Sequence, residues 1–154
     1  MPDLVTHVTA AYFLSCRRSE RFRVIFYLGT ILPDIAARPI HILFPKLYFF
    51  TIGIHTPVFM ILLSLLLAEF FHKSIKNLVF RYLIAGVFLH FFMDFFQRHL
   101  TTGYYWFYPF SWHSFEVGLF WPETPVRLIP LWVLLICGTE LLLWMRKRAT
   151  PVEN

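Results

Sequence analysis

Apolar residues are gathered into long runs along the chain, and short clusters of basic residues separate these runs. The runs cover residues 4–14, 24–35, 55–71, 80–96 and 129–145. A helix needs about 20 apolar residues to cross a hydrocarbon core about 30 Å thick, and the last three runs approach that length. The first two are shorter, so their polar ends are expected to face neighbouring helices or trapped water. The pattern predicts an all-α protein, a polytopic membrane bundle of four to five helices.

Two segments between the runs carry the residues of turns and loops. The second run contains Leu32-Pro33-Asp34 near its end. Arg38, Pro39, Pro45 and Lys46 then predict a loop or re-entrant segment through Phe50. Residues 98–127 are rich in aromatic side chains and proline, which predicts a long loop at a membrane surface, where tryptophan and tyrosine are enriched.

The composition supports lipid as the solvent of these helices. The chain is 58% hydrophobic and 15% charged, against about 45–50% and about 25% in soluble domains. A soluble domain of 154 residues keeps too much exposed surface to hide this apolar excess. We expect one membrane-embedded domain over residues 1–148, with a short polar tail at 149–154, and the lipid bilayer as a partner.

The basic residues predict the orientation in the membrane. The net charge is +5, but its clusters lie between apolar runs, so no nucleic-acid partner is expected. If the clusters after the first, third and last helices share one side, that side holds Arg17, Arg18, Arg21, Arg23, Lys73, Lys76, Arg81, Arg146, Lys147 and Arg148. The opposite side then holds Arg38, Lys46, Arg98 and Arg127. The positive-inside rule therefore predicts an N-terminus outside and a C-terminus in the cytoplasm.

This orientation brings five metal-ligand side chains to one level near the outer face: His7, Asp34, His55, His90 and Asp94. An ionisable side chain at membrane depth costs about 2.5–3.5 kcal/mol, which makes each a candidate functional residue. His90 and Asp94 are four residues apart, so both point from one helix face. Imidazole and carboxylate ligands together suit zinc, manganese or iron.

Each of these residues also has a structural interpretation. A histidine within a helix is usually only hydrogen-bonded, Asp34 could cap the following segment, and Asp94 could form a helix ion pair with Arg98.

Two other acidic residues in the apolar runs are interpreted as structural. Glu69 lies four residues before Lys73, and Glu140 lies one to two turns before Arg146. Each glutamate is therefore expected to form an ion pair with that basic residue along its own helix.

The order of these motifs resembles a family of small bacterial inner-membrane proteins described as metal-dependent hydrolases, of the LexA-binding, inner membrane-associated type. That family is distantly similar to the zinc-dependent phospholipase C and single-strand nuclease superfamily. The resemblance covers roughly residues 5–112 and rests on Thr6-His7-Val8, Leu32-Pro33-Asp34, Ile54-His55-Thr56, His90 with Asp94, Thr101-Thr102-Gly103 and Trp106–Phe110.

The resemblance implies a phospholipase C-like helical fold and a set of ligands for one or two divalent ions, with zinc favoured. Asp34, His55, His90 and Asp94 would hold one ion, and His7 would help to hold a second ion bridged by Asp94. The chain departs from the family pattern after the Pro-Asp pair, where Ile35-Ala36-Ala37 replace a second acidic residue.

A later group of polar residues is the remaining ligand candidate. His99, His113 and Glu116 have a spacing similar to that of a further metal site in the phospholipase branch. The polarity of a loop explains the same three residues without a metal.

The leading hypothesis is a multi-pass hydrolase of the bacterial inner membrane that cleaves a phosphoester of a lipid or lipid-linked compound at the outer face. Asp34 or Asp94 would orient the water, and Arg38 or Arg98 would neutralise the phosphate. The alternative is a non-catalytic metal-binding membrane protein that acts as a carrier, sensor or structural bundle.

Overall fold

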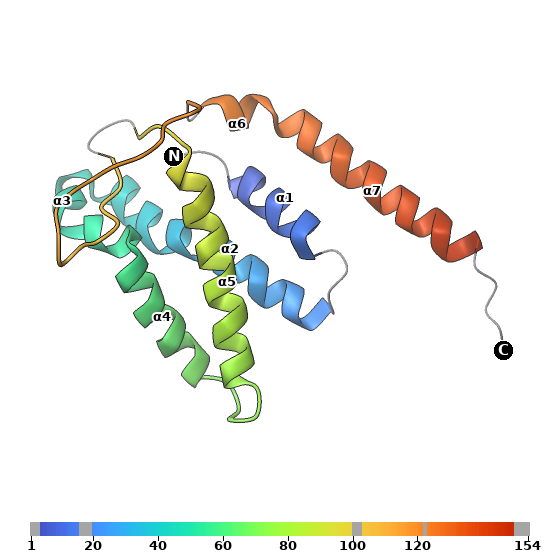
Figure 1. Ribbon diagram of the computed structural model, residues 1–154, viewed down its shortest axis with the longest axis horizontal. Helices are drawn as coiled ribbons and strands as arrows, with labels where there is room; N and C mark the ends of the chain where they lie inside the picture. The colour runs from blue at the N-terminus through green and yellow to red at the C-terminus, as the bar shows by residue number, and fades with distance from the viewer. Residues whose placement is uncertain (1–3, 16–19, 100–102, 122, 150–154) are drawn as a thin grey trace.

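The computed structural model describes residues 4–15, 20–99, 103–121 and 123–149, and within them the fold is all-helical (Figure 1). The elements are α1 (Leu4–Ser15), α2 (Glu20–Leu43), η1 (Pro45–Leu47), α3 (Tyr48–Thr51), η2 (Ile52–His55), α4 (Pro57–Glu69), α5 (Lys76–Phe95), α6 (Glu123–Arg127) and α7 (Ile129–Ala149). Residues 150–154 of the predicted polar tail lie outside the described residues, as do Thr101 and Thr102 of the family motif.

Helix α2 is longer than the sequence predicted. It continues through Pro33 and Pro39 to Leu43, so the expected loop from Arg38 is wrong and Asp34 lies inside the helix rather than at its end. Proline removes one helical hydrogen bond but keeps a φ angle that suits a helix. The extensive packing of α2 against α5 and α1 compensates for the lost bonds.

Two glycines allow α2 and α5 to pack at close range. A Cβ atom added to Gly86 would collide with the carbonyl oxygen of Phe26 and lie 2.6 Å from the backbone nitrogen of Thr30. One added to Gly29 would lie 2.9 Å from the Cα atom of Leu83. Small residues at membrane helix crossings permit such close backbone contact. This crossing sets the distance between the polar residues that follow on both helices.

Apolar clusters hold α2, α4 and α5 together on either side of this crossing. One cluster contains the buried side chains of Leu32, Met60, Val87 and Phe91. The other contains Ala68, Val79 and Leu83, near the turn between α4 and α5.

An ion pair closes the turn between α4 and α5. Nζ of Lys76 lies 2.8 Å from Oε1 of Glu69. Glu69 therefore pairs across the turn with Lys76 and not along its own helix with Lys73 as predicted, because α4 ends at Glu69.

The aromatic segment 103–121 folds back over the end of α5. Backbone hydrogen bonds connect Val117 to Phe95 and Leu119 to Phe96, at 3.0 and 2.7 Å. The indole nitrogen of Trp106 donates to the carbonyl oxygen of Phe115, at 2.6 Å. These contacts place the loop beside the residues at the end of α5.

Helix α7 lies apart from the rest of the bundle. Figure 1 shows it running beside α1 and away from α4. Tyr12 of α1 donates a hydrogen bond to Glu140 of α7. Among the described helices, α5 and α7 are long and apolar enough to cross a membrane, whereas α1 and α4 are shorter apolar helices.

Candidate metal centre

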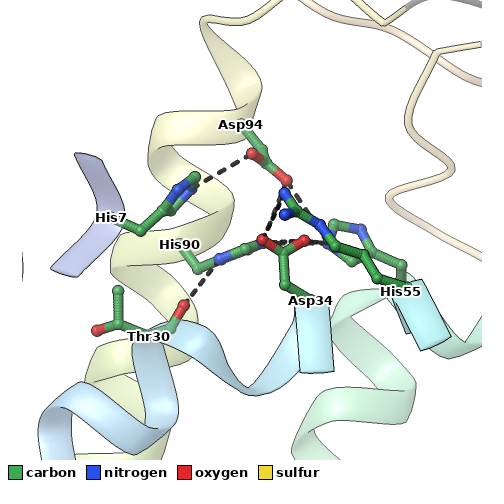
Figure 2. A network of polar contacts seen from close by, with 7 residues as sticks. His7, Thr30, Asp34, His55, His90 and Asp94 are labelled. Atoms are coloured by element: carbon green, nitrogen blue, oxygen red, sulfur yellow. Dashed lines mark hydrogen bonds and ion pairs between the residues drawn. The ribbon is translucent and has the colours of Figure 1, made fainter. Parts of the chain in front are cut away.

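Five polar side chains meet where α1, α2, η2 and α5 approach one another (Figure 2). They are His7, Asp34, His55, His90 and Asp94, and each is at most 8% exposed. Each element brings its residue by ordinary geometry: His90 and Asp94 are one helical turn apart, and His55 ends the short helix η2 just before Pro57 begins α4. The sequence predicted all five as candidates, and the structure brings all five together.

Four donor atoms form a compact group at the middle of this cluster. Nε2 of His90 lies 3.1 Å from Nε2 of His55 and 3.2 Å from Oδ2 of Asp94. Nε2 of His55 lies 3.6 Å from Oδ2 of Asp94. Oδ1 of Asp34 lies 3.8 Å from Nε2 of His55 and 3.9 Å from Nε2 of His90.

These spacings suit a shared cation. Tetrahedral zinc, with ligand bonds of about 2.0–2.1 Å, separates neighbouring donor atoms by about 3.3–3.4 Å. The five separations given above, which join the imidazole nitrogens to each other and to the two carboxylate oxygens, span 3.1–3.9 Å around that value. Two imidazole nitrogens and two carboxylate oxygens are also a donor set that zinc, manganese and iron accept. The buried histidine and aspartate groups could therefore hold a metal ion.

His7 lies on the far side of Asp94. Its Nε2 atom is 3.4 Å from Oδ1 of Asp94, whereas Oδ2 faces His55 and His90. The His7 ring also stacks on the His90 ring, with centroids 4.3 Å apart. His7, His90 and Asp94 form a second group of potential ligands beside the group of Asp34, His55 and His90. The two oxygens of Asp94 thus face different histidines, Oδ1 toward His7 and Oδ2 toward His55 and His90.

A backbone contact fixes the tautomer of the His90 ring. Nδ1 of His90 lies 2.8 Å from the carbonyl oxygen of Thr30, which can only accept a hydrogen bond. Nδ1 therefore carries the proton in the neutral ring, and Nε2 offers its lone pair to the centre. Metal-binding histidines commonly donate their other ring nitrogen to such a carbonyl.

The two arginine candidates lie in different surroundings. Nη2 of Arg38 is 2.8 Å from Oδ2 of Asp34, one helical turn away, so Arg38 lies at the edge of the centre. Arg98 follows the end of α5, where it donates to the carbonyl oxygen of Gly118 and lies over the ring of Trp121. The carboxylate of Asp94 contacts three histidines, so the structural interpretation of Asp94 as the partner of Arg98 in a helix ion pair does not account for its surroundings.

The later candidates His99, His113 and Glu116 lie in the loop region. The backbone N–H of His99 donates to Oε2 of Glu116, at 2.8 Å, and His113 is exposed. Within the part of the chain that the structure describes, none of the three joins either ligand group. Burial lowers the pKa of His99, which keeps its ring neutral at neutral pH.

The sequence did not single out a small pocket beside the centre. The pocket has a volume of about 20 Å³, and its walls include His41, Tyr48, His55, His99 and Tyr104. Tyr104 is 5% exposed, and burial, then the Asp94 and Asp34 carboxylates, raise the pKa of its hydroxyl. Gly103 directly precedes Tyr104, and its backbone has a positive φ of 78°.

The chain belongs to the YdjM inner membrane protein family, because the model of that family matches residues 3–153. No curated protein and no solved structure matches the chain. The family description and the two apolar helices agree with the membrane protein that the composition predicted.

Proposed function

We propose that this protein is a membrane-embedded, metal-dependent hydrolase that cleaves a phosphoester of a lipid or lipid-linked compound. The observation that carries the proposal is the buried group of two imidazole nitrogens and two carboxylate oxygens from α2, η2 and α5. Each imidazole nitrogen lies 3.1–3.9 Å from the other imidazole nitrogen and from both carboxylate oxygens. Separate structural roles would not require four such groups to converge in an apolar protein, because each is costly to bury alone.

Zinc is the proposed ion, and His7 with Asp94 offers room for a second. A bound divalent cation supplies Lewis acidity and lowers the pKa of a coordinated water toward about 7. The carboxylates of Asp34 and Asp94 fix the ligand geometry, and Thr30 holds His90 with Nε2 toward the centre.

In the proposed reaction, the oxygen of water forms a bond to phosphorus while the bond from phosphorus to the alcohol oxygen breaks. One proton of the water passes to a carboxylate of Asp34 or Asp94, and that carboxylic acid then passes the same proton to the departing alkoxide. Arg38, fixed by its contact with Asp34, is the proposed partner of the phosphate charge. Arg98 is the weaker candidate, because its guanidinium lies over Trp121.

The proposed topology is a multi-pass bundle with a phospholipase C-like arrangement, an external N-terminus and a cytoplasmic C-terminus. It is supported by the ten basic residues that fall at one end of the predicted helices, out of 14 in the chain. In this topology the centre lies near the outer face, where a lipid headgroup is within reach.

The test uses the full chain purified in detergent and loaded with zinc. We expect elemental analysis to find one or two zinc ions per chain. We expect cleavage of bis(p-nitrophenyl) phosphate, p-nitrophenyl phosphate or a phospholipid in mixed micelles. Asp34→Asn should lower both metal content and activity, whereas Glu69→Gln, far from the centre, should lower neither. A folded, zinc-containing protein that cleaves none of these substrates would contradict the proposal.

A non-catalytic metal-binding role is the second candidate, and the enclosure of the centre favours it. Every proposed ligand is at most 8% exposed, and structural metal sites are typically closed whereas catalytic sites keep an open position. Tightly bound zinc that raises the melting temperature, with no hydrolysis of any tested substrate, would support this function in place of the hydrolase.

A further inference from the structure

An apolar groove lies between the start of α4 and the second half of α5, with the aromatic loop along one side. Its volume of about 330 Å³ is at the lower end of the range of ligand pockets. Its walls are the side chains of Pro57, Phe88, Phe91, Phe92, Phe95 and Trp106. The indole N–H of Trp106 donates to the carbonyl oxygen of Phe115, so these walls present hydrocarbon to the groove.

The groove lies at the level of the metal centre. On α5, His90 and Asp94 belong to the centre, and Phe91 between them lines the groove. The Phe91 ring is 5.4 Å from the ring of His55 and 5.8 Å from the ring of Trp106, measured between centroids. A single side chain therefore separates the groove from a proposed metal ligand.

The surroundings of the groove indicate a hydrocarbon chain as its occupant. The protein belongs to an inner membrane family, and α5 is apolar enough to cross a membrane. Phe88 and Phe92 in the groove wall are 70% and 52% exposed, so the groove is open to the surrounding lipid. A polar headgroup or a peptide backbone would lose hydrogen bonds against such a wall. A second helix fits less well, because helix contacts in membranes use small residues, whereas this wall consists mainly of large rings.

We propose that the groove holds a hydrocarbon chain of a membrane phospholipid whose phosphate reaches the metal centre. The inference rests on the proposed function and names its substrate class, which is a phosphoester joined to a long hydrocarbon chain and not a soluble phosphoester. A chain held beside Phe91 fixes the position of the attached phosphate relative to His55, as a positioning contact does.

Trp106 can report whether the groove is occupied, because its indole is part of the wall. The test uses the full chain, loaded with zinc in phosphatidylcholine bilayers, with the other four of its five tryptophans replaced by phenylalanine. The probe is a phosphonate analogue of phosphatidic acid, which cannot be hydrolysed, with bromine atoms on its chain that quench tryptophan fluorescence on contact. We expect the quenching of Trp106 to saturate at a low mole fraction of probe. Random contact with lipid would instead rise in proportion to that fraction.

Two phenylalanine substitutions in this reporter protein test the position of the site. Phe92→Ala removes part of the groove wall and should raise the probe fraction for half-maximal quenching about 3- to 10-fold, the scale of one aromatic contact. Phe70→Ala is the matched control, because Phe70 is 80% exposed at the other end of α4. It should leave the quenching curve unchanged. Zinc content and melting temperature should stay the same in both variants.

Removal of zinc with EDTA tests the connection to the centre. It should raise the half-saturating probe fraction about 10- to 100-fold, the effect of losing a contact to a charged group. Quenching that follows the mole fraction without saturation would overturn the inference, as would equal curves for Phe92→Ala and Phe70→Ala. Saturable quenching that does not depend on zinc would overturn the assignment of the groove to the substrate. Saturable, zinc-dependent quenching in a protein that hydrolyses no phosphoester would support the groove while contradicting the hydrolase.

Discussion

Helices α5 and α7 both have the length and hydropathy of a membrane span, yet they lie in different surroundings. In the most apolar 18-residue window of each helix, 39% of the residues of α5 are buried inside the protein and none of those of α7. Helix α5 packs against α2, α4 and α1, whereas α7 contacts mainly α1 and α6. The two helices are thus both apolar, but α5 lies at the centre of the bundle and α7 lies at its edge.

The polar residues on the two helices reflect this difference. On α5, His90 and Asp94 are surrounded by side chains from three other elements. On α7, Glu140 accepts a hydrogen bond from Tyr12 of α1, and the guanidinium of Arg23 acts on it electrostatically. Apolar content alone therefore does not separate an interior helix from an outlying one. The burial of the helix inside the protein separates them, and the following substitutions test this difference.

The largest effect is expected from Gly86→Ala. The added methyl group would collide with the backbone of α2 at Phe26 and Thr30, which cannot move aside as a side chain can. We expect a loss of about 3 kcal/mol in the free energy of unfolding, at the upper end of overpacking effects. The matched control is Gly138→Ala on α7, where an added Cβ has no atom within 4 Å. Its expected effect is a gain of about 0.5 kcal/mol from helix propensity. Equal losses in thermal unfolding would remove the distinction between the helices.

The next effect is expected from Asp94→Asn, compared with Glu140→Gln. Even an outer-shell partner of a metal ligand contributes about 10- to 100-fold in affinity, so loss of the Asp94 charge should weaken zinc binding by more than about 100-fold. At a zinc concentration 100 times the dissociation constant, the wild type should gain about 2.7 kcal/mol from the metal, and Asp94→Asn should lose this gain. Chelator competition and melting with and without EDTA measure both quantities. Glu140→Gln with the same zinc loss would contradict the assignment of the centre to α5.

A smaller effect is expected at the contact between α1 and α7. A double-mutant cycle of Tyr12→Phe and Glu140→Gln should give a coupling energy of about 0.6–1 kcal/mol, the usual range for a hydrogen bond between membrane helices. Zinc content should not change in any variant of the cycle. A coupling above about 2 kcal/mol would show that α7 is bound to the bundle as firmly as the inner helices.

The smallest effect is expected at the turn between α4 and α5. Glu69 and Lys76 form an ion pair at the protein surface, with 65% and 34% of their side chains exposed. Glu69→Gln should change the free energy of unfolding by no more than about 0.5 kcal/mol, because solvent screens such pairs. The same melting experiment measures it, and a change larger than that of the α1–α7 pair would reverse the expected order.

The sequence predicted the helices wherever an apolar run was long, because burial and lipid exposure both demand continuous backbone hydrogen bonding. It also predicted that His90 and Asp94 share a face, since a spacing of four residues decides this within one helix. To predict that His7, Asp34 and His55 lie at the same level as this pair, one must also know which helix ends share a side of the membrane. The clusters of basic residues indicated that. The roles of these residues as ligands stay predictions.

The sequence was less informative where distant segments decide the local structure. The extent of α2 was wrong because Pro33 and Pro39 are locally unfavourable in a helix, and packing against α5 outweighs that preference. Lys76 instead of Lys73 pairs with Glu69 because the chain turns at that point. Tyr104 was missed because a loop has no periodicity that indicates which side chains point inward.

The contact between Asp34 and Arg38 has a consequence for biosynthesis. His7 and Asp94 are far apart in the sequence, so the complete cluster cannot exist until the ribosome has produced most of the chain. Asp34, however, has its cationic neighbour one helical turn away, at 2.8 Å. The nascent α2 can therefore enter the membrane with the Asp34 carboxylate already paired with Arg38. The helices that are made later then pack against a paired carboxylate instead of an isolated charge.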